Sequence, residues 1–182
     1  MSTIGVAAGH TRKTEGERLY EHRKCCMAAE HLADMLAEAG HIPITVPEAL
    51  YDIDNDSSLR RRVTHFNNSN TDLNVALHLN AGGGNYSTTI HYPGSLNGTR
   101  LAECVEDAVA FMRPHRRSIG AKSQNYFDRH LHMLMATSAP SVIVEPGFKD
   151  HETHRAWMDS QSFAIDYAAM VFVGIQRYVA LP

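Results

Sequence analysis

Short apolar runs alternate along the whole chain with longer segments in which apolar residues recur at helical spacing. Five of the runs predict strands, over residues 3–8, 42–46, 73–80, 87–92 and 141–145. In the last run Val142, Ile143 and Val144 are consecutive β-branched residues, which is typical of a central strand covered on both faces. A glutamate, Glu145, closes this run, and a carboxylate at the edge of a core is costly unless it is paired or used.

Four other segments predict helices. Gly40 stands where the C-terminal cap of the first belongs, and Ser57 and Ser58 are candidate N-caps for the second, which carries residues 59–66. The third covers residues 97–112. The first and the last show apolar stripes at helical spacing, formed by Ala28, Leu32, Met35, Leu36 and Ala39 and by Ala164, Ala168, Val171, Ile175 and Tyr178. This alternation predicts an α/β fold with a mostly parallel central sheet of about six strands flanked by helices.

Composition narrows the class of protein. The chain has 182 residues with no linker-like or repeated segment, so we expect one domain, residues 1–182. A formal charge of -3 gives no reason to expect nucleic acid or an anionic membrane as a partner. No run is long enough to span a bilayer, and the first residues lack the pattern of a secretory signal. Three cysteines without CxxC spacing predict free thiols in a reducing compartment.

Candidate chemistry gathers at the ends of the predicted strands. His10, His78 and Glu145 all stand at or near carboxyl ends, where parallel sheets place their functional groups. Each histidine alone, among twelve in the chain, is more often a loop or core residue. Two histidines at the same edge of a sheet favour a zinc site, because open catalytic zinc sites often use two histidines and a carboxylate as ligands. Glu21 is one candidate for that carboxylate, with Glu15 and Glu17 as alternatives; a first-turn acid can also simply favour the helix dipole.

Three motifs carry a resemblance over nearly the whole chain. The segments "VAAGH", "DLNVALHLNA" and "VIVEPGF", in this order, resemble the zinc-dependent N-acetylmuramoyl-L-alanine amidases of the Amidase_3 type. The resemblance implies that His10, Glu21 and His78 hold a zinc ion and that Glu145 is the catalytic base and acid. It also implies the substrate, the amide between the lactyl group of N-acetylmuramic acid and L-alanine in peptidoglycan. The family pattern further falls on three residues that we interpret as structural supports: Arg62, Asn67 and Asp72.

The residues that would contact the substrate depart most from the family. Thr11 and Arg12 follow the first histidine, where members commonly have glycines, and "TTIHYPGS" replaces an aromatic segment. We take Asn80, His91 and His132 as candidate substrate-binding residues. His130 and His132 would share a face on a strand. The run Arg60 to Arg62 is typical of a solvated helix face, although Arg62 also falls on the family pattern.

Two other functions compete with this hypothesis. A zinc exopeptidase or deacylase could use the same ligands on an α/β fold. A wall-binding relative without catalysis is the third possibility, although the joint presence of His10, Glu21, His78 and Glu145 argues against it. We expect a monomer that binds peptidoglycan, is made in the cytoplasm and acts on the cell wall. A phage endolysin fits this context, and a host enzyme whose leader was removed would look the same.

Overall fold

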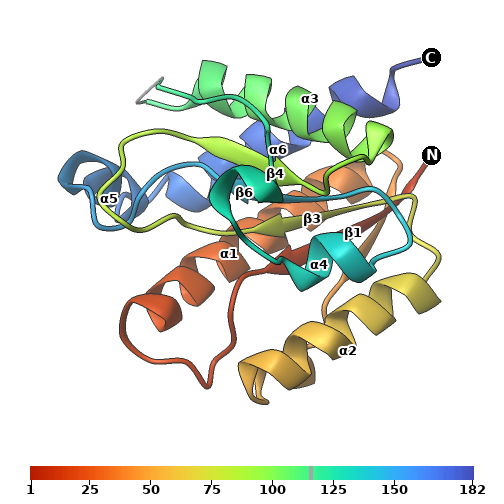
Figure 1. Ribbon diagram of the computed structural model, residues 1–182, viewed down its shortest axis with the longest axis horizontal. Helices are drawn as coiled ribbons and strands as arrows, with labels where there is room; N and C mark the ends of the chain where they lie inside the picture. The colour runs from red at the N-terminus through yellow and green to blue at the C-terminus, as the bar shows by residue number, and fades with distance from the viewer. Residues whose placement is uncertain (115–116) are drawn as a thin grey trace.

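A six-stranded sheet forms the centre of the molecule, with helices on both faces (Figure 1). The computed structural model describes residues 1–114 and 117–182. The strands are β1 (Thr3–Ala8), β2 (Ile42–Thr45), β3 (Leu73–Leu77), β4 (Thr88–His91), β5 (Lys122–Ser123) and β6 (Ser141–Glu145). Their order across the sheet is β2-β1-β3-β6-β4-β5. All neighbours are parallel except β4 and β6, which run antiparallel. The expected α/β fold with a mostly parallel sheet is therefore confirmed.

The helices form two layers. They are α1 (Gly16–Glu38), α2 (Asn55–Asn68), α3 (Leu96–Met112), α4 (His132–Ala136), α5 (Glu152–Met158) and α6 (Phe163–Val179), with short 3-10 turns η1 (Glu48–Tyr51) and η2 (Gln124–Phe127). Helix α6 packs between α1 and α3 on one face of the sheet, and α2 packs with α4 on the other. No helix in the described part of the chain is both long and apolar enough to cross a membrane.

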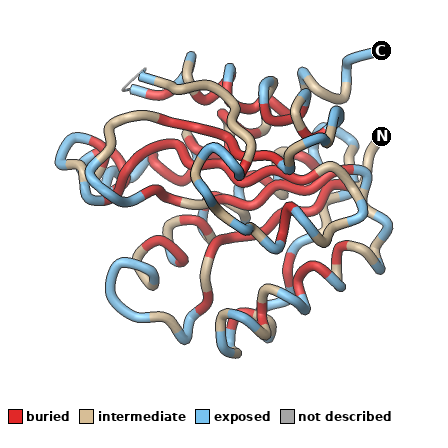
Figure 2. Tube along the Cα trace, in the orientation of Figure 1, coloured by how far each residue is buried: buried red, intermediate tan, exposed pale blue. Residues whose placement is uncertain are grey.

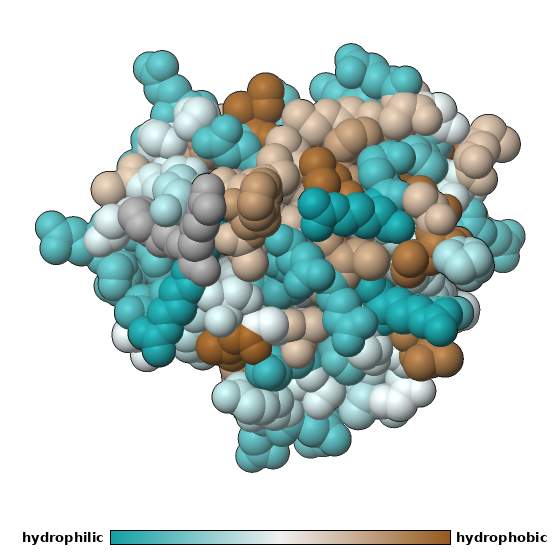
Figure 3. Space-filling model, turned by 90° about the horizontal axis from the view of Figure 1, so that it is seen from above, coloured by the Kyte–Doolittle hydropathy of each residue, from teal (hydrophilic) through white to brown (hydrophobic). Residues whose placement is uncertain are grey.

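The central strands are buried because both of their faces are covered. Every residue of β3 and β6 is buried, and Figure 2 shows burial concentrated along the middle of the sheet. Hydrophobic and hydrophilic residues are mixed on the face seen in Figure 3, as expected for an ordinary protein surface. The cysteines, Cys25, Cys26 and Cys104, are free and buried or half-buried, as predicted.

Several element boundaries differ from the predictions. The predicted N-caps of α2 were wrong: Asp54 is the cap, and its carboxylate accepts the Ser57 N–H at 2.9 Å. The third strand ends at Leu77, three residues earlier than predicted. His130 and His132 do not share a strand face, because His132 begins helix α4. The two-residue strand β5 carries too short a pattern to be recognised in the sequence.

Gly174 permits the closest approach between two helices. A Cβ at this position of α6 would lie 2.4 Å from the Val105 Cα of α3, a backbone atom that cannot move away alone. We expect Gly174→Ala to lower the free energy of unfolding by about 1–3 kcal/mol through overpacking. Urea denaturation would measure this as a lower midpoint at an unchanged slope. The exposed Arg177→Ala on the same helix is the control, with an expected effect below about 0.5 kcal/mol. An unchanged midpoint for Gly174→Ala would show that α3 and α6 separate at little cost.

Candidate active site

Neighbouring strands bring the predicted residues to one edge of the sheet. His78 directly follows β3, Glu145 ends β6, and the His78 N–H donates to the Val144 carbonyl at 3.0 Å. The Tyr167 hydroxyl of α6 contacts the carbonyls of His78 and Val144 at 3.2 and 2.7 Å, which ties the two strand ends together. The two side chains are therefore held on a rigid part of the fold.

His10 reaches the same edge from the adjacent strand β1. It lies two residues beyond the strand and has a positive φ of 58°. Gly9, between the strand and His10, allows the close approach of the His78 ring, because a Cβ at position 9 would lie 2.5 Å from the His78 Cε1. The rings of His10 and His78 are 5.5 Å apart between centroids and nearly perpendicular.

Glu21 comes from helix α1 and lies between the two histidines. Its Oε2 is 3.3 Å from His10 Nε2, and its Oε1 is 3.0 Å from His78 Nδ1. The three ligand atoms lie within 4.8 Å of one another, and no other group of His, Cys, Asp and Glu in residues 1–114 and 117–182 converges in this way. Burial raises the pKa of Glu21, but its hydrogen bonds with His10 and His78 outweigh this and hold the pKa well below its usual range. Glu21 is therefore ionised.

Two imidazole nitrogens and one carboxylate oxygen form a donor set that suits zinc. Catalytic zinc sites commonly use three protein ligands of these types and leave one position open. The alternative acids do not join this cluster. Glu17 is exposed and pairs with Arg155 at 2.9 Å, and Glu15 is exposed just before α1. The fit of His10, Glu21 and His78 to a metal therefore rests on three donors that converge from three elements.

Glu145 is buried beside this cluster but is poorly paired. Glu145 is only 5% exposed. Its Oε1 is 3.0 Å from Arg129 Nη1, whereas its Oε2 has no hydrogen-bond partner among the described residues. Burial raises the pKa of Glu145, although the charges of Arg129 and His78 lower it in part. Two carboxylates whose pKa values are pushed in opposite directions, here Glu21 and Glu145, are typical of sites where one binds and the other transfers protons.

Replacement of Arg129 by Met is expected to move the acid limb of the pH profile to higher pH. The Arg129 charge lowers the pKa of Glu145, so without it the carboxyl stays protonated up to a higher pH, and a reaction that uses Glu145 as its base would lose rate there. The profile of kcat/KM between about pH 5 and 9 would measure the shift. Arg18→Met, an exposed change at the start of α1, is the control. An unmoved acid limb would contradict the assignment of this limb to Glu145.

The candidate substrate-binding residues fall in different places. His132 is exposed and lines a cavity of about 110 Å³ together with His10 and His78. Asn80 is buried, and its backbone pairs with the segment after β6, with the Lys149 N–H donating to the Asn80 carbonyl at 2.9 Å. His91 ends β4, which runs antiparallel to β6, so it lies opposite Val142 rather than Glu145. The structure therefore does not bring His91 to the histidine–glutamate cluster.

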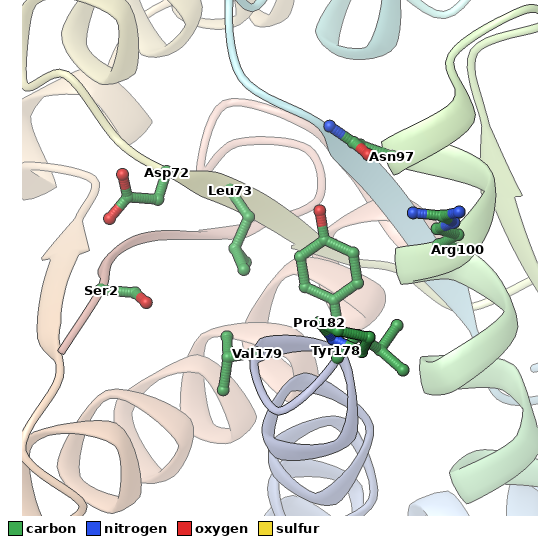
Figure 4. Close-up of a pocket in the computed structure, with 9 residues that line it drawn as sticks. Ser2, Asp72, Leu73, Asn97, Arg100, Tyr178, Val179 and Pro182 are labelled. Carbon is green, nitrogen blue, oxygen red and sulfur yellow. The ribbon is translucent and has the colours of Figure 1, made fainter.

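The three residues interpreted as supports all make backbone contacts. Arg62 donates to the Ala8 carbonyl at 2.7 Å, close to His10. The Asn67 side chain bonds the Ala136 carbonyl and the Ser138 N–H, and the Asp72 carboxylate accepts the Thr3 N–H at 2.7 Å. Asp72 lies at the opposite edge of the sheet, where it lines a pocket of about 280 Å³ with Ser2, Asn97 and Arg100 (Figure 4). These contacts hold strand ends and loops rather than a reacting group.

Sequence reasoning missed two residues of the site. Arg129 lies in the loop before α4, and no local pattern connects it with Glu145. Lys149 follows "VIVEPGF" directly, and its Nζ lies 2.5 Å from Glu21 Oε2. A lysine immediately after a motif that carries the catalytic candidate was a signal that could have been used.

Comparison with known proteins decides the family. A sequence model described as N-acetylmuramoyl-L-alanine amidase, of the Amidase_3 type, matches residues 4–177. The chain belongs to this amidase family. None of the curated proteins matches it by sequence. The amidase thus shares its family pattern over almost its whole length.

Solved structures support the fold of the amidase. The N-acetylmuramoyl-L-alanine amidase AmiC2 of Nostoc punctiforme has a TM-score of 0.84 at 20% identity, over 99% of this chain and 98% of that one. The catalytic domain of the CD27L endolysin, targeting Clostridia difficile, has a TM-score of 0.75 at 22% sequence identity, over 97% of this chain and 98% of that one. The CwlD amidase from Clostridioides difficile, solved in complex with the GerS lipoprotein, has a TM-score of 0.77 at 18% sequence identity, over 100% of both chains.

Proposed function

We propose that this amidase is a zinc-dependent peptidoglycan hydrolase that cleaves the amide between the lactyl group of N-acetylmuramic acid and L-alanine. The observation that carries the proposal is the convergence of His10, Glu21 and His78 beside Glu145, whose Oε2 is buried and has no described partner. The match to the amidase family supports the substrate. We further propose that residues 1–182 act as a single catalytic domain.

Different residues of the site have different proposed roles in hydrolysis. His10, Glu21 and His78 would hold a zinc ion, which would act as a Lewis acid on the amide carbonyl and would lower the pKa of a water molecule. Glu145 Oε2 takes a proton from the attacking water and then gives it to the leaving amine. Arg129 holds Oε1, so that the second oxygen stays free for this transfer. Burial suits this role, because it raises the pKa of Glu145 toward the range where a carboxyl both accepts and returns a proton.

Substrate contacts and biological context extend the proposal. His132 is proposed to contact the substrate, because it lines the cavity next to His10 and His78. Asn80, whose backbone pairs with the segment after β6, is proposed as a lesser contact, and His91 is not. We also propose a lytic, endolysin-like role on the cell wall, which is compatible with the family and with the likeness to an endolysin catalytic domain. The chain is proposed to act as a monomer, after synthesis in the cytoplasm.

Digestion of purified peptidoglycan tests the proposed function. The zinc-loaded protein is expected to release free stem peptides that begin with L-alanine, identified by mass spectrometry. Cleavage inside the stem peptide would instead indicate a zinc peptidase. Bound walls without soluble products would indicate a wall-binding protein that lacks catalysis.

A further inference from the structure

Lys149 is placed beside the candidate metal ligands by a well-defined backbone. After β6 the chain pairs with the segment following β3, and the Lys149 N–H donates to the Asn80 carbonyl at 2.9 Å. The lysine is only 8% exposed, and its Nζ lies 2.5 Å from Glu21 Oε2. A lysine that is almost fully buried is rare unless its charge is paired, so this contact is built into the fold.

Both oxygens of Glu21 are engaged by the protein itself. Oε1 accepts the Leu79 N–H at 3.0 Å and faces His78, while Oε2 contacts the Lys149 ammonium and faces His10. A cation held by His10, Glu21 and His78 would therefore share the carboxylate with a fixed positive charge. In a buried site the repulsion between two cations is screened much less than at the surface.

We propose that Lys149 is an internal counter-ion of Glu21, which stabilises the metal-free protein and weakens metal binding. Without a metal the buried Glu21 carboxylate needs a positive partner, and Lys149 supplies it. With a divalent cation bound, the same ammonium repels the metal. The interaction of Lys149 with its surroundings is therefore more favourable in the metal-free form than in the metal-bound form. The difference between these two interaction free energies is subtracted from the free energy of metal binding, so the affinity for the metal falls. This inference rests on the metal site of the proposed function.

Zinc affinity, measured by competition with a chromophoric chelator, tests the proposal without relying on activity. Lys149→Met removes the charge and keeps an unbranched chain of similar length, and we expect it to bind zinc at least about 10-fold more tightly. Lys149→Arg keeps the charge and is expected to bind close to wild type. Lys24→Met, which removes a half-buried lysine paired with Asp159, is the matched control and should leave the affinity unchanged.

Thermal unfolding gives a second, independent readout. In the presence of EDTA, Lys149→Met should unfold at a lower temperature than wild type, whereas the gain in Tm on adding zinc should be larger. If Lys149→Met does not fold without metal, Lys149→Gln, which can still donate to Glu21, replaces it with the same expected direction.

Three outcomes distinguish a failure of the Lys149 proposal from a failure of the proposed peptidoglycan hydrolysis. Unchanged or weaker zinc binding by the neutral variants would overturn the Lys149 proposal. A wild-type protein that binds no zinc would overturn both the proposal and the metal site. Tighter zinc binding by Lys149→Met, in a protein that does not cleave peptidoglycan, would support the counter-ion role and contradict only the proposed function.

Discussion

Replacement of Glu145 by Gln is expected to slow amide hydrolysis by about 10²–10⁴-fold, the range associated with loss of a general acid–base. Glutamine keeps the shape of the side chain and can still accept a hydrogen bond from Arg129, but it cannot take a proton from water. Because Glu145 Oε2 has no hydrogen-bond partner in the described structure, its loss removes chemistry rather than a structural contact. Steady-state kcat/KM on soluble muropeptides, with zinc content and Tm measured in parallel, would show this.

The control for Glu145→Gln is Glu152→Gln, an exposed glutamate in the first turn of α5. It should leave the rate unchanged. The zinc content of Glu145→Gln should also match wild type, because Glu145 is not among the three ligand candidates. A variant that is fully active would mean that Glu145 serves only as the partner of Arg129, and the base would have to be sought elsewhere.

Removal of the metal or of one ligand is expected to have the other large effect. Dialysis against a chelator should abolish hydrolysis, and added zinc should restore it. Glu21→Ala should lose stoichiometric zinc and at least about 100-fold in activity, since even the outer partners of metal ligands are worth 10–100-fold. The reason is that Glu21 is the only carboxylate within the converging cluster of the described residues.

Glu17→Ala is the matched control for Glu21→Ala. Both glutamates belong to α1 and are one turn apart, but Glu17 is exposed and pairs with Arg155. Metal analysis of the two purified variants should show zinc in Glu17→Ala and not in Glu21→Ala. The reverse result would show that the wrong acid has been assigned and would require a different arrangement at the start of α1.

The sequence by itself determined the fold class and the position of three functional candidates. The apolar runs marked β1, β3 and β6, and parallel strands must present their carboxyl ends at one edge. His10, His78 and Glu145 therefore had to lie near one another. This reasoning fails for His91. Strand β4 runs antiparallel to β6, so its carboxyl end lies at the other edge of the sheet, and hydrophobic periodicity carries no information on strand direction.

The family resemblance pointed to Glu21, but only the tertiary structure showed that this acid lies between the two histidines and what surrounds it. Position along the chain alone does not separate Glu15, Glu17 and Glu21. In the structure, Glu21 begins the buried stripe of α1, continued by Cys25 and Ala28, and faces the sheet edge. Arg129 reaches Glu145 from the loop before α4, and Lys149 reaches Glu21 across 128 residues of the chain. Contacts of this kind depend on how loops and helices pack on the sheet, and local spacing along the chain does not encode them.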